Sequence, residues 1–138
     1  MKRIILSIGL LVGIVFSVTA PADPANPGPK VSAFTLKSDV KGPKRLFVGV
    51  GGKIDGQVNP TLFVNEWEVV EITLINADGL PHHIALPDFF ILSNEVKEKE
   101  QKTTITFVPF KSGGFVYYCD LEGHRKLGME GQMTVVRR

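Results

Sequence analysis

An alternation of apolar and polar residues, with a period near two, is the feature of this 138-residue chain that most limits how it can fold. The run Trp67–Ile75 alternates most clearly, with Glu68, Val70, Ile72 and Leu74 on one side of an extended backbone. Turn-forming pairs such as Asn-Pro, Asp-Gly and Gly-Gly separate runs of this kind. Eight strands are predicted: Val31–Lys37, Arg45–Val50, Thr61–Val64, Trp67–Ile75, His82–Leu86, Lys102–Val108, Gly114–Cys119 and Gly131–Val136.

Helical periodicity is weak throughout the chain. The best candidate, Asn94–Gln101, is dense in charge and has no apolar face, so it is predicted to form a loop or a single helical turn. Several short strands without a long helix indicate an all-β fold. We therefore expect an antiparallel Greek-key β-sandwich of about eight strands in one domain.

The N-terminal segment has the order of a secretory signal peptide. Met1-Lys2-Arg3 is basic, an apolar run extends from Ile4 to Val18, and Ala20-Pro21-Ala22 fits the cleavage pattern. The apolar run is short for a hydrocarbon layer of ~30 Å, which disfavours the alternative of an uncleaved anchor. The predicted organisation is a signal peptide at residues 1–22, a proline-rich tether at 23–30 and the folded domain at 31–138. We expect export to the periplasm or another extracytoplasmic compartment, without stable membrane insertion after cleavage.

The charge pattern excludes some function classes. The whole chain has a formal charge of +2, and loss of Lys2 and Arg3 with the signal peptide leaves a neutral domain. A neutral domain is a poor candidate for nucleic-acid binding. The run Gly49–Ile54 lacks the spacing of a phosphate-binding loop and is predicted as a turn. Glu66 and Glu68 share one strand face and are expected to be solvated rather than catalytic.

Soft metal-binding donors are few and lie mainly near the C-terminus. The chain has one cysteine, Cys119, which excludes an intrachain disulfide and a zinc site built on paired cysteines. Cys119, His124 and Met129 follow one another at intervals of five residues, within the loop predicted between the last two strands. One turn can therefore bring a thiol, an imidazole and a thioether together. By residue type alone, Cys119 and His124 could also form a nucleophile–base pair, and Met133 is predicted to fill the core.

A further donor must come from another strand, and the other two histidines are His82 and His83. Successive side chains of a strand face opposite sides of the sheet, so only one of the two can point inward. His82 shares the parity of Ile84 and Leu86, which predicts that it faces the core. A trigonal set of two imidazoles and one thiolate, with a weak axial thioether, has the composition of a blue-copper electron-transfer site, although zinc can use such donors. The predicted ligands are His82, Cys119, His124 and Met129.

Two segments that carry these donors resemble those of a known family. Asn76-Ala-Asp-Gly-Leu-Pro-His82-His-Ile is similar to the plastocyanin-like segment that presents the first histidine ligand, and Tyr117–Gly131 is similar to the C-terminal ligand loop of the cupredoxins. Asp55–Pro60 and Ile84–Asp88 resemble segments of the cupredoxin domain found free-standing or fused to copper nitrite reductases. The resemblance extends over residues 31–136. It departs at His83, where Asn, Asp or Ser is more usual, and at Glu66-Trp67, where a Gly-Asp turn is more usual and Trp67 is expected in the core or at its rim.

The resemblance implies one type 1 copper ion and a small monomeric electron carrier that docks transiently with redox proteins such as a cytochrome or a copper reductase or oxidase. Copper delivery or storage with the same ligands is the alternative. An enzyme is not expected, because a second copper site needs more histidines and the residue before Cys119 is Tyr118. The ring edge of His124 is expected within an apolar patch of Leu80, Pro81, Leu127 and Gly128, surrounded by Asp120, Glu122, Arg125, Lys126 and Glu130.

Overall fold

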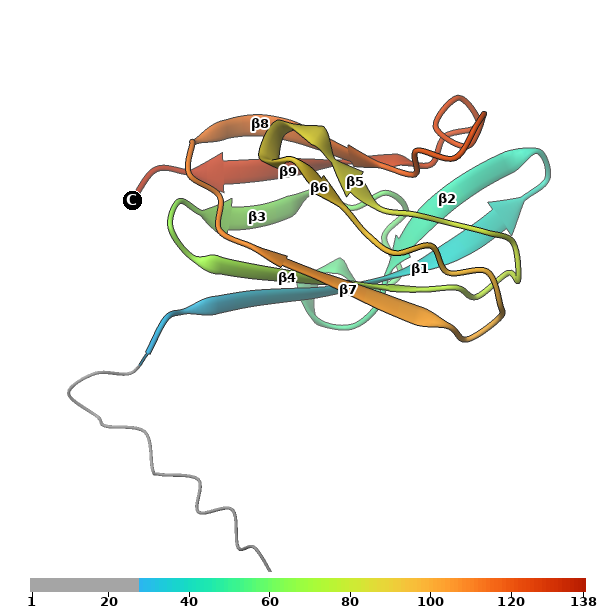
Figure 1. The fold of residues 1–138 in the computed structure, drawn as a ribbon, viewed down its shortest axis with the longest axis horizontal. Helices are drawn as coiled ribbons and strands as arrows, with labels where there is room; N and C mark the ends of the chain where they lie inside the picture. The colour runs from blue at the N-terminus through green and yellow to red at the C-terminus, as the bar shows by residue number, and fades with distance from the viewer. Residues whose placement is uncertain (1–27) are drawn as a thin grey trace, which may run out of the picture.

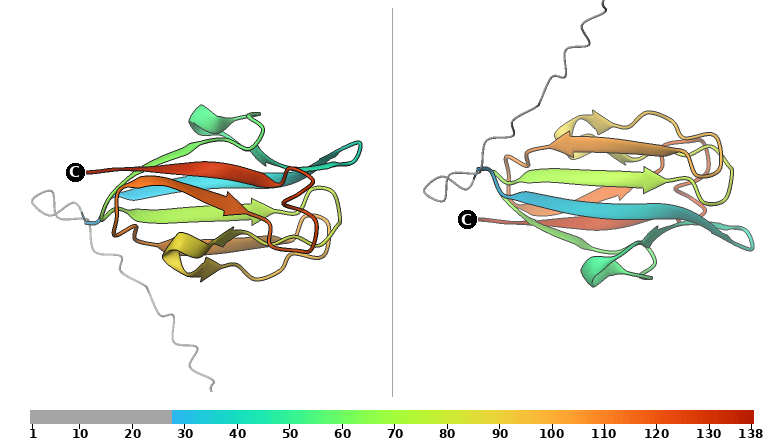
Figure 2. Two further views of the ribbon diagram at one scale, coloured as in Figure 1. Left: turned by 90° about the horizontal axis from the view of Figure 1, so that it is seen from above. Right: turned by 90° about the horizontal axis from the view of Figure 1, so that it is seen from below.

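The computed structural model describes residues 28–138, and within them nine strands form two sheets that face each other (Figures 1 and 2). The predicted signal peptide and most of the predicted tether lie outside the described residues. Among residues 28–138, no helix is long and apolar enough to cross a membrane. The strands are β1 (Val31–Lys41), β2 (Lys44–Gly49), β3 (Leu62–Asn65), β4 (Val69–Ile75), β5 (Ala85–Leu86), β6 (Ile91–Leu92), β7 (Lys102–Phe107), β8 (Gly113–Tyr118) and β9 (Glu130–Val136), with short 3-10 turns η1 (Gly52–Ile54) and η2 (Pro87–Phe89).

The sheet order confirms the predicted β-sandwich and adds two parallel pairings. One sheet has the order β2-β1-β4-β7 and the other β3-β9-β8-β5-β6. β1 pairs with β4 and β3 with β9 in parallel, whereas the other neighbours are antiparallel, so the expectation of a wholly antiparallel sandwich is wrong for these two pairs. The chain crosses repeatedly between the sheets, and these crossings place strands that are distant in sequence side by side.

The core follows the alternation in the sequence. Val70, Ile72 and Leu74 of β4 are fully buried between the sheets, and in β7 Ile105 and Phe107 are buried in the same alternating manner. Full burial of each such side chain contributes about 1.5–3 kcal/mol to folding. The opposite sheet supplies the facing side chains of the core cluster: Leu62, Val64, Ile84, Leu86, Tyr117, Met133 and Val135.

The turn before β4 differs from the prediction. Trp67 lies outside the strand, at a positive φ of 65°, and its side chain is 64% exposed rather than part of the core. The expected solvated face of Glu66 and Glu68 is wrong for Glu68, which is 2% exposed. A buried carboxylate is tolerated when it is paired and hydrogen-bonded. Its partners are Ser32 Oγ at 3.2 Å, Asn65 Nδ2 at 2.8 Å, Lys30 Nζ at 3.0 Å and Arg138 at 3.8 Å.

This buried carboxylate makes stability depend on pH. The hydrogen bond from Lys30, opposed by burial and assisted by bonds from Asn65 and Ser32, lowers the pKa of Glu68 from 4.5 to about 2. A group whose pKa is lower in the folded state stabilises the fold above its unfolded pKa and loses that contribution as pH falls. We expect Glu68→Gln to unfold at clearly lower urea than the parent at pH 7, with the difference shrinking between pH 4.5 and 2. Glu66→Gln is the control, and an equal or pH-independent loss in both variants would contradict the role of Glu68.

Candidate metal centre

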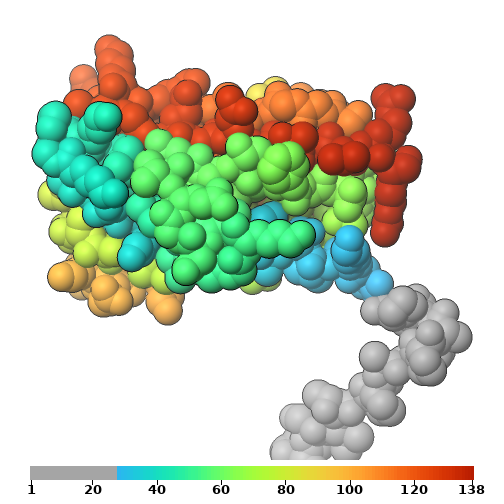
Figure 3. All heavy atoms as spheres, turned by 180° about the vertical axis from the view of Figure 1, so that it is seen from behind, coloured from blue at the N-terminus to red at the C-terminus, as the bar shows by residue number. Residues whose placement is uncertain are grey.

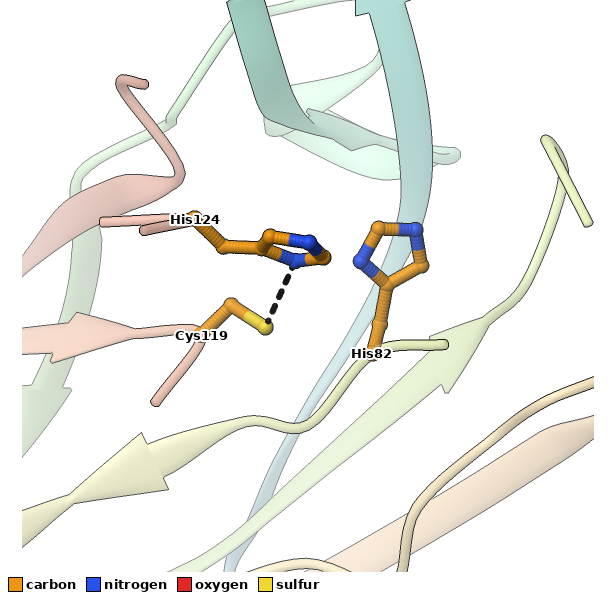
Figure 4. Close-up of side chains that lie close together, drawn as sticks. All are labelled: His82, Cys119 and His124. Carbon is orange, nitrogen blue, oxygen red and sulfur yellow. Dashed lines mark hydrogen bonds between the residues drawn. The ribbon is translucent and has the colours of Figure 1, made fainter. Parts of the chain in front are cut away.

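Three predicted donor side chains converge at one end of the sandwich. One ligand atom each from His82, Cys119 and His124 lies within 4.8 Å of the other two (Figure 4). The loops that carry them come from the same end of the molecule as the β1–β2 hairpin, opposite the C-terminus (Figures 1 and 3). Cys119 directly follows β8, His124 lies in the turn between β8 and β9, and His82 precedes β5.

His82 is held by both its backbone and its ring. Its backbone N–H and C=O pair with Val96 at 2.9 and 3.0 Å, and the side chain is fully buried, as the strand parity predicts. The ring nitrogen Nε2 lies 2.9 Å from each carboxylate oxygen of Asp78. The other ring nitrogen, Nδ1, is buried without a hydrogen-bond partner and faces Cys119 and His124 (Figure 4). A buried polar atom without a partner is costly, and here it points into a set of metal-binding donors.

Burial shifts the pKa values of Cys119 and His124 toward their neutral forms. Desolvation raises the pKa of the Cys119 thiol, against hydrogen bonds from the backbone of His83 and Leu121. Desolvation, followed by repulsion from His82 and Arg45, lowers the pKa of His124. A neutral imidazole has the free lone pair that a metal needs, whereas the thiol must release its proton on binding. Metal binding at this cluster therefore releases a proton and weakens in acid.

The Asp78 carboxyl stays ionised beside His82. Burial raises its pKa, but hydrogen bonds from the Leu80 backbone and the His82 ring outweigh burial, so the pKa lies below its ordinary value.

The neighbouring His83 contacts two other acidic side chains. Its Nδ1 lies 2.7 Å from Asp120 Oδ1 and its Nε2 lies 3.7 Å from Glu95 Oε2. The His83 backbone N–H also points to Cys119 Sγ at 3.4 Å. His83, which departs from the family pattern, thus joins the two donor segments.

The loop from Cys119 to Met129 closes on itself through backbone hydrogen bonds. Cys119 N–H donates to Met129 O and Met129 N–H to His124 O, both at 3.1 Å, which brings the first and last residues of the loop side by side. Gly123 and Gly128 have φ values of 82° and 101°, which glycine adopts without strain. Met129 is fully buried. The structure therefore places the thioether residue inside the fold directly beside the cysteine backbone.

Asn59, which no pattern in the sequence singled out, ties this loop to β2. Its Nδ2 donates to Gly128 O at 2.8 Å, and its Oδ1 accepts from Phe47 N–H at 3.0 Å. A second bond runs from Arg45 N–H to Leu127 O at 3.1 Å. Asn59 and Asp78 both lie in segments that resemble the family, but neither had an assigned role; the Asn59 partner Gly128 is 69 positions away, whereas Asp78 contacts the nearby Leu80 and His82. Both side chains restrain the site before any metal binds.

The predicted surface residues lie in loops at this end. Leu80 and Leu127 are 36% and 40% exposed, Pro81 is exposed, and Gly128 and His124 are half-buried. Beside the loop, Pro43, Leu46, Val58 and Leu127 line an open groove flanked by Lys44 and Lys126. Arg125 pairs with Glu130 and lies over the Tyr118 ring, 4.2 Å from its centroid. The surroundings are thus apolar with charges of both signs.

The known proteins that this chain resembles in sequence or in fold include several copper proteins. The copper-containing nitrite reductase of Rhizobium meliloti (strain 1021) is 31% identical over 141 residues, which cover 88% of this chain and 36% of the relative. Rusticyanin from Thiobacillus ferrooxidans has a TM-score of 0.58 at 22% identity, covering 79% of each chain. Auracyanin A, a blue copper protein from Chloroflexus aurantiacus, has a TM-score of 0.57 at 15% identity, covering 77% of this chain and 99% of its own.

The enzyme relatives are longer than this chain. The copper nitrite reductase of Nitrosomonas europaea has a TM-score of 0.61 at 20% identity, covering 79% of this chain and 42% of the enzyme. This chain spans about a third of the length of the Rhizobium relative. No family model matches the sequence.

Proposed function

We propose that the chain is a cupredoxin, which binds one type 1 copper ion and serves as a small electron-transfer protein. His82, Cys119 and His124 would hold the metal, and Met129 would be a weak axial ligand. When bound, copper supplies one-electron chemistry by cycling between Cu(II) and Cu(I). The protein contributes a soft thiolate, two imidazoles and a largely apolar surround, which together suit copper in both oxidation states.

The observation that carries the proposal is the unpartnered Nδ1 atom of His82. It is buried, it faces the other donors, and its ring is already held by a carboxylate on the far side. Such an arrangement leaves a lone pair that no described residue uses and that a metal can accept. A site held rigidly before the metal binds changes little when an electron arrives, which is what electron transfer requires.

The donor set favours copper over zinc and a carrier over an enzyme. Structural zinc sites use four strong donors, most often with several cysteines, whereas this cluster offers one thiol and one buried thioether residue. A self-contained copper reductase needs a second histidine-rich site. The third histidine of the chain, His83, is occupied with Asp120 and Glu95.

Export and partner choice extend the same proposal. The signal-like residues 1–22 would direct the chain to the periplasm or another extracytoplasmic compartment, followed by a tether at 23–30. Redox proteins would dock briefly at the end of the molecule where His124 is half-buried and Leu80 and Leu127 are exposed. Charges of both signs around this end would steer partners only weakly.

Copper titration of residues 23–138 tests the proposal directly. We expect one equivalent of Cu(II) to saturate the protein and to produce an intense visible band from thiolate-to-copper charge transfer, which one electron bleaches. Zinc(II) should compete for the same single site without colour. Binding of copper without that band would favour delivery or storage over electron transfer, and no binding would refute the proposal.

Met129→Leu is expected to keep the visible band but raise the reduction potential. Leucine has a similar volume, so the buried position remains filled at a cost below about 1.5 kcal/mol. Loss of an axial donor disfavours Cu(II) relative to Cu(I) by roughly tenfold, which is about 59 mV for one electron. Met133→Leu is the matched control because Met133 is also fully buried and lies in β9. Equal potentials in the two variants would show that Met129 is not a ligand.

A further inference from the structure

We propose that Asp78 is a positioning residue that sets the ring orientation and tautomer of His82 and thereby lowers the reduction potential of the bound copper. The effect on potential rests on the proposed function, whereas the effect on the tautomer does not. None of the sequence patterns singled out Asp78, and its role follows from contacts across the turn before β5.

The geometry of the contact between Asp78 and His82 selects the tautomer of the His82 ring. Both carboxylate oxygens of Asp78 lie 2.9 Å from His82 Nε2, a hydrogen-bonding distance for either oxygen. An ionised carboxylate can only accept, so Nε2 must carry the proton and donate it. In this tautomer the ring has its lone pair on Nδ1, which is the buried atom without a partner. Asp78 therefore selects the tautomer that turns the free lone pair of His82 toward Cys119 and His124.

Hydrogen bonds within the turn hold the Asp78 side chain in place. Its side chain is 11% exposed, and its Oδ1 also accepts from the Leu80 N–H at 2.8 Å. Asn76 shapes the same turn, because its Oδ1 accepts from Gly79 N–H at 2.7 Å and its Nδ2 donates to Leu80 O at 2.6 Å. β4 ends one residue earlier and is paired with β1 up to Ile75. The carboxylate is thus fixed by the sandwich rather than by the metal.

The negative charge of Asp78 would act on the bound copper through the His82 ring. A carboxylate bound to the outer nitrogen of a ligating imidazole makes that imidazole a stronger donor. Its negative charge stabilises Cu(II) more than Cu(I), because the oxidised ion has the larger positive charge. At 11% exposure this interaction is only partly screened by water. Reduction would still take up one electron from a redox partner and no proton, but the free energy of reduction would be less favourable.

The neighbouring His83–Asp120 pair provides an internal comparison. It is also an imidazole–carboxylate contact, at 2.7 Å, but Asp120 is 35% exposed and His83 lies outside the cluster of donors. Asp120 follows Cys119 directly and raises the pKa of its thiol, so removing the Asp120 charge should act on the site by proximity alone, without contact to a ligating ring. The two aspartates separate contact with a ligand from mere proximity of a negative charge.

The main test measures reduction potentials of the copper-loaded full-length protein and its Asp78→Asn and Asp120→Asn variants. Asparagine keeps an oxygen that can accept from His82 Nε2 but has no charge. We expect Asp78→Asn to retain the visible band and to shift the ratio of Cu(II) to Cu(I) affinity by tenfold or more toward Cu(I), about 59 mV upward. Asp120→Asn should shift it by less than threefold. Equal shifts in both variants, or a lower potential in Asp78→Asn, would overturn the charge effect.

A second test needs no metal. Nitrogen NMR of ¹⁵N-histidine-labelled, metal-free protein at pH 8 should show His82 protonated at Nε2 and unprotonated at Nδ1. Asp78→Asn should retain this tautomer, whereas Asp78→Ala should lose the preference. A wild-type His82 protonated at Nδ1 would overturn the proposal even if copper binds. If the tautomer is as expected but copper gives no thiolate band, the proposed function fails while the role of Asp78 in positioning His82 stands.

Discussion

Replacing Cys119 by serine is expected to abolish the intense visible band of the copper-loaded protein completely. The band requires a sulfur orbital that donates charge to Cu(II), and a serine hydroxyl supplies neither the orbital nor, near neutral pH, an anion. Cys119 is the only cysteine in the chain, so no other sulfur can replace its thiolate. Absorption spectra recorded at equal protein and copper concentrations measure the effect.

The serine variant should remain folded, which keeps the result interpretable. Cys119 is fully buried, and its Sγ lies 3.4 Å from both the His83 N–H and His124 Nδ1, positions that a smaller hydroxyl can also serve. Urea unfolding of the metal-free proteins provides the control. The free energy of unfolding is expected to fall by about 3 kcal/mol at most, because one buried hydrogen-bond acceptor is changed. A band that persists in folded Cys119→Ser would show that the colour arises elsewhere and would refute the proposed centre.

The parts of this structure that could be predicted are those governed by local periodicity. Alternation within residues 67–75 put Val70, Ile72 and Leu74 on one side of a strand, and this side is buried; the same reasoning distinguished buried His82 from His83. The five-residue spacing correctly brought Cys119 and His124 together, because both lie around one turn between paired strands. These inferences depend on neighbours in sequence, so they need no knowledge of how the sheets pack.

The features that could not be predicted depend on partners distant in the chain. Glu68 continues the inward parity of β4, but its burial depends on partners distant in the chain, among them Ser32 of β1 and Lys30 just before that strand. Asn59 looked like a turn residue, yet its amide holds Gly128 from 69 positions away. Strand periodicity fixes which way a side chain points, whereas the group it meets is decided by sheet order.

The register of β8 and β9 creates a tight contact beside the loop that carries Cys119, His124 and Met129. Tyr117 lies directly opposite Gly131, its side chain is fully buried, and its hydroxyl donates to Pro60 O at 2.7 Å. A Cβ atom on Gly131 would lie 2.2 Å from both Cζ and the hydroxyl oxygen of Tyr117. The ring passes over the glycine and fills the place of a side chain there. Because Gly131 is in an ordinary strand, space rather than backbone conformation requires glycine.

Gly131→Ala is therefore expected to destabilise the metal-free protein by about 3 kcal/mol, the upper end of the usual range for overpacking a core. Tyr117 cannot move aside without giving up its bond to Pro60, and its ring also packs 5.4 Å from that of Phe47. Urea denaturation measures the loss, which is large against a total stability of ~5–15 kcal/mol. Gly114→Ala is the matched control on the same strand pair, since nothing lies within 4 Å of its added Cβ, and it should change stability by no more than about 1 kcal/mol.

A double-mutant cycle separates this steric conflict from a general intolerance of β9. Tyr117→Leu should itself be destabilising, because it removes the buried hydrogen bond and part of the ring volume. In its presence, however, Gly131→Ala meets a smaller side chain, so the double variant should be more stable than the sum of the single losses by about 1–3 kcal/mol. Additive losses would mean that the ring does not collide with the new methyl group. A double variant that is more stable than this sum would establish that the Tyr117 ring packs against Gly131 across the two strands that flank Cys119 and Met129.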